Sequence, residues 1–145
     1  MFKNSEGYYD PTAGMALSQT MKEYRSQRKK VWNRQYGMKN RPKIYVASPY
    51  SGNIGKNSAT AIRYCHYVIN QGKMPIASHL LYPQMLDDDI PEERELGQMF
   101  GLSLLALCDE AWVFGSRISS GMEAEIAETN RLNKPIRYIS EEAMR

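Results

Sequence analysis

Short apolar runs alternate with longer helical patterns along the chain from residue 43 onward. Four β-branched or aromatic runs predict strands at residues 43–47, 75–77, 111–114 and 135–139. Between them, apolar residues recur at three- and four-residue intervals and predict helices at residues 57–71, 91–107 and 122–133. This alternation is typical of a Rossmann-like α/β fold, in which a parallel sheet of four to five strands carries helices on both faces.

The first 42 residues follow a different pattern. Asp10 and Pro11 form a helix start, and Gly37 is a plausible stop, so we expect one long helix over residues 11–36. Its apolar positions form a stripe, interrupted by Arg28, that consists of Leu17, Met21, Tyr24, Val31 and Tyr36. We expect this stripe to pack against the rest of the protein or a second subunit. The pattern predicts a helical extension over residues 1–42 and an α/β domain over residues 43–145.

The charge divides at the same place. Nineteen Lys and Arg residues and sixteen Asp and Glu residues give a net charge of +3, the sum of a +6 extension and a −3 domain. The basic residues of the extension could contact nucleic-acid phosphates. A solvated helix face, or docking onto an acidic neighbour, explains them more simply, so we do not expect a nucleic-acid partner.

Cysteine content and hydropathy favour the cytoplasm. The two cysteines, Cys65 and Cys108, lie in predicted helices and are too few for a disulfide framework. The longest apolar run, residues 102–108, is about a third of the length that a membrane span needs. The N-terminus shows no apolar stretch typical of a signal peptide. We therefore expect a cytoplasmic protein without a membrane contact.

Ligands of such folds bind beyond the carboxyl ends of the strands. The loop at residues 115–121 lies there and contains Arg117, Ser119, Ser120 and Gly121 before a predicted helix. Hydroxyl groups, backbone N–H groups and a guanidinium at a helix start are suited to bind a phosphate. The serines could equally serve as helix caps, because capping and anion binding use the same atoms.

Two glutamates follow this loop. Glu123 and Glu125 are separated by about 200° around a helix, so they cannot both face one site. Glu125 shares a stripe with Met122, Ile126 and Thr129 and is expected to face inward. Nearby donors would keep its carboxylate ionised and available as a nucleophile. Alternatively, Glu125 only complements the helix dipole from a half-exposed position.

No metal ion or cofactor is expected. Cys65 and His66 are adjacent on a predicted helix and point about 100° apart, which makes them a poor pair of ligands. His79 and Asp87 lack the spacing of a metal site.

Three segments carry a family resemblance: KIYVASPY at residues 43–50, CDEAWVFG at 108–115, and SGMEAEI at 120–126 before Lys134 and Pro135. Together they resemble the nucleoside 2-deoxyribosyltransferase-like superfamily over most of residues 43–139, with most similarity to uncharacterised members from phages and mobile elements. The resemblance implies an enzyme that cleaves the N-glycosidic bond of a nucleotide or nucleoside, by hydrolysis or transfer, through a glutamate nucleophile. It also implies a homo-oligomer, in the host cytoplasm if the protein is phage-encoded.

The resemblance assigns roles to individual residues. The nucleophile of the superfamily lies nine residues before the Lys that precedes the last strand, which here is Glu125. Tyr45 would orient Glu125. The substrate pocket would include Ser48, Tyr50, His79, Arg117, Ser119, Ser120, Gly121 and Met122.

Two positions depart from the pattern of the superfamily. Gly101 stands where the transferases have an aspartate that protonates the leaving base, and Ser119 where they often have one that engages the sugar. The second change resembles the branch that hydrolyses nucleoside 5′-monophosphates. Without the first aspartate the base leaves as an anion, unless His79 or an acid among Asp87, Asp88 and Asp89 donates the proton. The alternative function is a non-catalytic protein that sequesters a nucleotide-derived signal.

Overall fold

The computed structural model describes residues 11–49 and 53–145, and the chain divides into two units. The first unit ends at Asn40, and its described part is the helix α1 (Pro11–Lys39). The predicted N-terminal helix is confirmed, and it continues through Gly37, because a single glycine costs a helix only about 1 kcal/mol. The stripe residues from Leu17 to Tyr36 are exposed. Their packing partner, and the division into extension and domain, stay predictions.

The second unit runs from Arg41 to Arg145 and contains a parallel sheet of four strands in the order β2-β1-β3-β4. The strands are β1 (Lys43–Ala47), β2 (Met74–Ile76), β3 (Glu110–Phe114) and β4 (Ile136–Ile139). In the central pair, Tyr45 lies opposite Ala111. The predicted α/β class and strand positions are confirmed to within one residue at each strand end.

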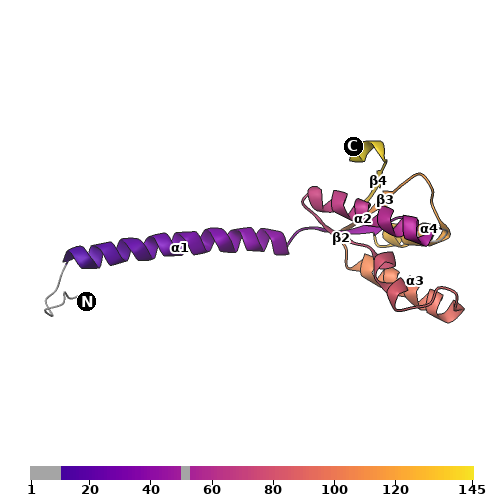
Figure 1. Cartoon of the computed structure of the whole chain (residues 1–145), viewed down its shortest axis with the longest axis horizontal. Helices are drawn as coiled ribbons and strands as arrows, with labels where there is room; N and C mark the ends of the chain where they lie inside the picture. Colours follow the sequence, from indigo (N-terminus) through magenta and orange to yellow (C-terminus); the bar gives the residue numbers. More distant parts are fainter. Residues whose placement is uncertain (1–10, 50–52) are drawn as a thin grey trace. The chain divides into compact units, whose positions relative to one another are not determined.

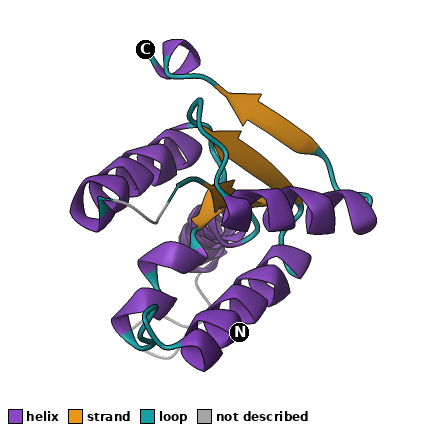
Figure 2. Cartoon of the chain, turned by 90° about the vertical axis from the view of Figure 1, so that its right-hand side faces the viewer, coloured by secondary structure: helices purple, strands orange, loops and turns teal. Residues whose placement is uncertain are grey.

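Helices cover both faces of the sheet, as predicted (Figure 2). Because side chains alternate along a strand, Ile44 and Val46 face α2 (Ile54–Asn70), while Tyr45 and Ala47 belong to the core under the opposite helices. These are α3 (Pro91–Ala106) and α4 (Ser120–Arg131). Figure 1 shows the same elements along the chain. Every residue of β1 after Lys43 is buried, as expected for a central parallel strand.

Local capping sets the helix starts at the carboxyl end of the sheet. Asn53 Oδ1 accepts the Lys56 N–H at 3.0 Å and starts α2 three residues earlier than the apolar spacing predicts. The predicted irregular stretch after β2 contains two short 3₁₀ turns, Ser78–Leu80 and Tyr82–Gln84. Among the described residues, no helix combines the length and the apolarity that crossing a bilayer requires.

Candidate active site

Two pockets meet at the carboxyl edge of the sheet, between β1 and β3. The chain leaves β1 toward β2 on one side, and β3 leads to β4 on the other, so the strand order reverses here. Such a reversal opens a crevice in which α/β folds bind ligands. Ser48, the first residue after β1, lines both pockets. We call them the Glu125 pocket and the Arg117 pocket after one residue of each.

The Glu125 pocket contains most of the predicted substrate-binding residues. Glu125 lines it together with Ser48, His79, Ser119, Ser120, Gly121 and Met122. Arg117 lines the Arg117 pocket, whereas the two serines with which it was expected to hold a phosphate line the Glu125 pocket. Tyr50 lies outside the described residues. The roles assigned to all these residues stay predictions.

Helix α4 positions Glu125. Ser119 caps the helix by accepting the Met122 N–H at 3.3 Å, so the capping role foreseen for this serine is present. Met122 and Thr129 are buried on the inward stripe, Glu125 lies between them, and Glu123 is exposed. Glu125 therefore faces the pocket, as the helical geometry predicts.

The carboxyl group of Glu125 is buried and incompletely bonded. Its Oε2 atom accepts no hydrogen bond from any described residue. Burial raises the pKa of Glu125 to about 8, although the Tyr45 hydroxyl lowers the pKa in part. The expectation that nearby donors keep this carboxylate ionised is wrong, because burial outweighs them. A pKa of about 8 favours the protonated form of Glu125 at pH 7.

Tyr45 lies beneath the pocket in β1 and is fully buried. Its hydroxyl forms a hydrogen bond of 2.7 Å with Ser78 Oγ. Burial and the charge of Glu125 raise the pKa of Tyr45, so its hydroxyl keeps its proton and can donate it in a hydrogen bond to the carboxylate. Sequence reasoning missed Ser78, although its place just after β2 at the carboxyl edge was a usable signal.

Gly101 faces the same pair of hydroxyls. A Cβ atom at this position would lie 3.0 Å from Ser78 Oγ and 3.3 Å from the Tyr45 hydroxyl oxygen. Ser78 and Tyr45 thus fill the space that a side chain at residue 101 would need. A glycine at position 101 therefore fits this packing, whereas a larger side chain would press on both hydroxyls.

His79 is the second polar residue that the turn after β2 brings to the pocket. Its Nε2 atom lies 3.0 Å from Ser48 Oγ. Burial lowers the pKa of His79 to about 4, so the imidazole is neutral at pH 7 and is not a cationic proton donor. Of the three aspartates considered for that role, Asp88 lines the pocket, where it lies 3.9 Å from Arg94.

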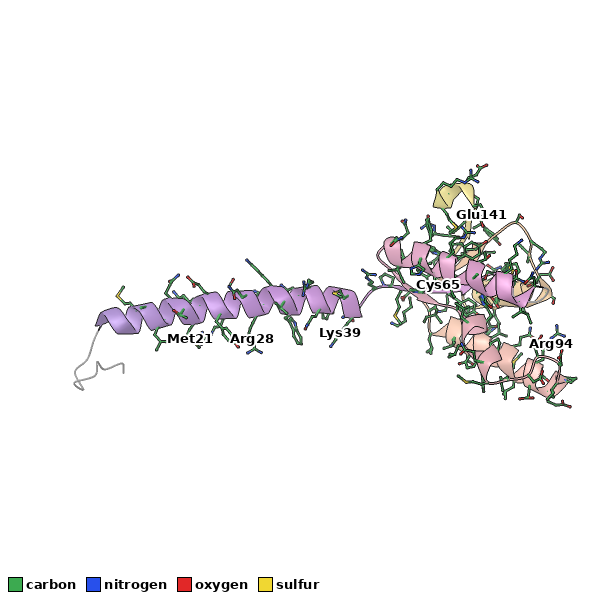
Figure 3. The ribbon with its side chains drawn as sticks, in the orientation of Figure 1. Met21, Arg28, Lys39, Cys65, Arg94 and Glu141 are labelled. Atoms are coloured by element: carbon green, nitrogen blue, oxygen red, sulfur yellow. The ribbon has the colours of Figure 1, made fainter. Side chains whose placement is uncertain are left out.

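The Arg117 pocket lies against the opposite face of the sheet, beside α2. Among the described residues, its charged lining consists of Lys56, Arg63 and Arg117 with one carboxylate, Glu141. Arg63 donates two hydrogen bonds to Glu141, of 2.9 and 2.7 Å, and the Tyr64 hydroxyl donates a third of 3.0 Å. Figure 3 shows Glu141 and Arg94, one from each pocket, far apart across this unit.

Within residues 11–49 and 53–145, no three His, Cys, Asp or Glu side chains are grouped to hold a metal ion. The chemistry available to the Glu125 pocket is that of a buried carboxyl group, two neighbouring hydroxyls and a neutral imidazole.

Comparisons with known proteins place this arrangement in a family. The sequence model of a family described as "Domain of unknown function (DUF7768)" matches residues 42–139. No curated protein matches the chain. Among solved structures, a 2-deoxyribosyltransferase from the psychrotolerant bacterium Bacillus psychrosaccharolyticus superposes with a TM-score of 0.53 and 19% sequence identity. The match covers 68% of this chain and 72% of that one, and at this identity it shows a shared fold.

Proposed function

This chain belongs to the DUF7768 family, and we propose that it cleaves the N-glycosidic bond of a nucleoside or nucleotide with Glu125 as the nucleophile. The observation that carries the proposal is the buried Oε2 atom of Glu125, which faces a pocket and lacks a hydrogen-bond donor among the described residues. A buried polar atom without a partner is costly, and a functional site is a common reason for it. The likeness to a 2-deoxyribosyltransferase supports the same chemistry.

The reaction proceeds in two displacements. A carboxylate oxygen of Glu125 attacks the anomeric carbon, the C–N bond breaks, and its electron pair leaves with the base. The base takes up a proton from water, because His79 is neutral at pH 7. Water or a second base then attacks the anomeric carbon of the glycosyl ester and gives up a proton to the hydroxide left by the first step. The products are the free sugar or a new nucleoside, and the carboxylate is restored.

Tyr45 and Ser78 act on the nucleophile. The Tyr45 hydroxyl lowers the pKa of Glu125 by hydrogen bonding, which favours the ionised form that attacks. Ser78 Oγ forms a hydrogen bond of 2.7 Å with the same hydroxyl and fixes its position. Since the pKa of Glu125 is about 8, the rate of cleavage rises with pH up to about that value.

Residues 119–121 provide the first contact for a 5′-phosphate in this scheme. They begin α4 and line the same pocket as Glu125. The backbone N–H groups of a helix start favour an anion, while Ser119 also caps the helix.

The alternative function is nucleotide sequestration without cleavage. Two observations favour it: residue 101 is a glycine packed closely against Ser78 and Tyr45 and cannot protonate the base, and His79 is neutral. A leaving base that receives no proton from the protein departs more slowly. The pocket would then bind a nucleotide and release it unchanged.

Chromatography of the free base distinguishes these functions. Purified protein is incubated at pH 8 with nucleosides and nucleotides carrying each common base. The proposal predicts release of base by the wild type and a loss of at least about 10³-fold in Glu125→Gln, which keeps the shape but not the nucleophile.

The control is Glu123→Gln, because Glu123 is exposed on the same helix. It should cleave at the wild-type rate. Equal release by wild type and Glu125→Gln overturns the proposed mechanism. Tight binding with complete recovery of intact ligand favours sequestration.

A further inference from the structure

We propose that the substrate carries at least two phosphates, and that the outer phosphate binds in the Arg117 pocket. This inference rests on the proposed function for the position of the sugar. It assigns a ligand to a pocket on the face of the sheet opposite Glu125.

The lining of the Arg117 pocket has an excess of positive charge. Lys56 and Arg63 come from α2, and Arg117 comes from the loop after β3. Glu141, the one carboxylate among the described lining residues, is engaged by Arg63 and Tyr64. The described lining thus has three cations to one carboxylate, and guanidinium and ammonium groups can donate charge-assisted hydrogen bonds to phosphate oxygens.

The Glu125 pocket has the opposite character. Its described lining includes Asp88, Glu93 and Glu125 against one cation, Arg94. A phosphate with two negative charges would be repelled at short range by Asp88 and Glu93, and by Glu125 once it ionises. A second phosphate is therefore more favourable in the Arg117 pocket, on the other side of Ser48, than in the Glu125 pocket.

The two pockets are connected by shared chain segments. Ser48 lines both, and one loop provides Gly115, Ser116 and Arg117 to the Arg117 pocket before residues 119–121 reach the Glu125 pocket. A ligand that follows this loop passes over the carboxyl edge of the sheet where the strand order reverses, the usual ligand crevice of the fold class.

The floor of the Arg117 pocket is preorganised. The ring of Tyr64 stacks on Phe114 with centroids 4.5 Å apart, and its hydroxyl donates to Glu141. Gly115 has φ = 84°, a conformation that L side chains rarely adopt, so glycine allows the loop to turn beside Tyr64. A floor fixed in this way reduces the ordering cost of ligand binding.

The test compares a nucleoside with its 5′-monophosphate and its 5′-diphosphate, using base release and calorimetry. Calorimetry is done on Glu125→Gln, which binds without cleaving. We expect the diphosphate to have about a tenfold lower KM and Kd than the monophosphate. Arg117→Ala and Lys56→Ala should each remove most of this difference, so that the diphosphate and the monophosphate have similar KM and Kd.

The matched control is Arg131→Ala, which removes one positive charge from an exposed side chain outside both pockets. It should keep the preference for the diphosphate. Equal KM and Kd for the two phosphates, or an equal loss in Arg131→Ala, overturns the inference while base release leaves the proposed function intact. Diphosphate binding that depends on Arg117, without base release from any substrate, supports the phosphate site and overturns the proposed function.

Discussion

The two pockets share Ser48 but differ in their charge, in the burial of their carboxyl groups and in the effect of those groups on stability. In the Glu125 pocket a carboxyl group is buried with one oxygen unbonded, and its pKa is raised to about 8. In the Arg117 pocket the carboxylate of Glu141 is half exposed and receives three hydrogen bonds, and Arg63 lowers its pKa. Burial of the Glu125 carboxyl group therefore lowers the stability of the fold, whereas the Glu141 carboxylate contributes to it.

This contrast shows why net charge is a poor guide to the ligand of this protein. The α/β part is acidic as a whole, yet its carboxyl edge has an acidic pocket on one face and a cationic pocket on the other. Local groups act at short range, whereas the average charge is screened beyond about 10 Å at moderate salt.

The largest expected effect is on stability, in Glu125→Gln. The folded-state pKa of Glu125 is raised from 4.5 to about 8. Below pH 4.5 the carboxyl is protonated in both states, so its ionisation does not affect the free energy of unfolding. As pH rises from 4.5 to 8, only the unfolded state ionises freely, so folding loses up to about 4 kcal/mol. Urea unfolding should show Glu125→Gln matching wild type at pH 4 and exceeding it by a few kcal/mol at pH 8.

Glu141→Gln is the matched change in the other pocket, and its effect should have the opposite sign. The pKa of Glu141 is lowered, so its contribution is present at neutral pH and is lost as pH falls through its folded-state pKa. Because the pair with Arg63 is half exposed, the loss should be below about 1 kcal/mol. A stabilised Glu141→Gln, or a Glu125→Gln difference that does not grow with pH, would contradict the contrast between the pockets.

An intermediate effect is expected at Gly101. In Gly101→Ala the new Cβ must displace Ser78 Oγ or the Tyr45 hydroxyl, both buried, at a cost of about 1–3 kcal/mol. The control lies one turn away, since a Cβ at Gly97 would meet Leu86 Cδ1 at an ordinary 3.4 Å. Denaturant titration should therefore show Gly97→Ala equal to wild type or more stable. Equal stability of Gly101→Ala and Gly97→Ala would refute the close packing at the floor of the Glu125 pocket.

The smallest effect concerns Tyr45. Tyr45→Phe removes the hydroxyl that lowers the pKa of Glu125, so the pKa rises above about 8. The rising limb of the pH–rate profile should move to higher pH by roughly one unit, the size of a typical hydrogen-bond contribution. At pH well above the limb the rate should recover toward wild type. A profile that drops uniformly without moving would mean that Tyr45 acts otherwise than through the protonation of Glu125.

The sequence was sufficient to predict the layered fold. Strands and helices follow from local periodicity in the sequence. The strand at residues 43–47 and the helix that begins at Pro91 are found where this periodicity predicts them. The errors lie at the ends of elements, where capping determines the first residue. Asn53, for example, starts α2 earlier than the apolar spacing predicts. The inward direction of Glu125 was also predictable, because it follows from helix geometry within one element.

The chemistry of the site was less accessible to sequence reasoning. The raised pKa of Glu125 depends on burial by elements that are distant in sequence, and the fit of Ser78 against Gly101 joins the turn after β2 to α3. Arg117 and Ser119 line different pockets because of how one short loop crosses the sheet edge. These features arise from tertiary packing and have no periodic signal.

The role of Glu125 as a nucleophile is tested most directly by intact-mass spectrometry of protein quenched during turnover at pH 8, followed by peptide mapping. The account predicts a fraction of protein whose mass is increased by one glycosyl unit, with the added mass on the peptide that contains Glu125, and no such species in Glu125→Gln. A glycosyl adduct on any other residue, or undiminished turnover by Glu125→Gln, would contradict it.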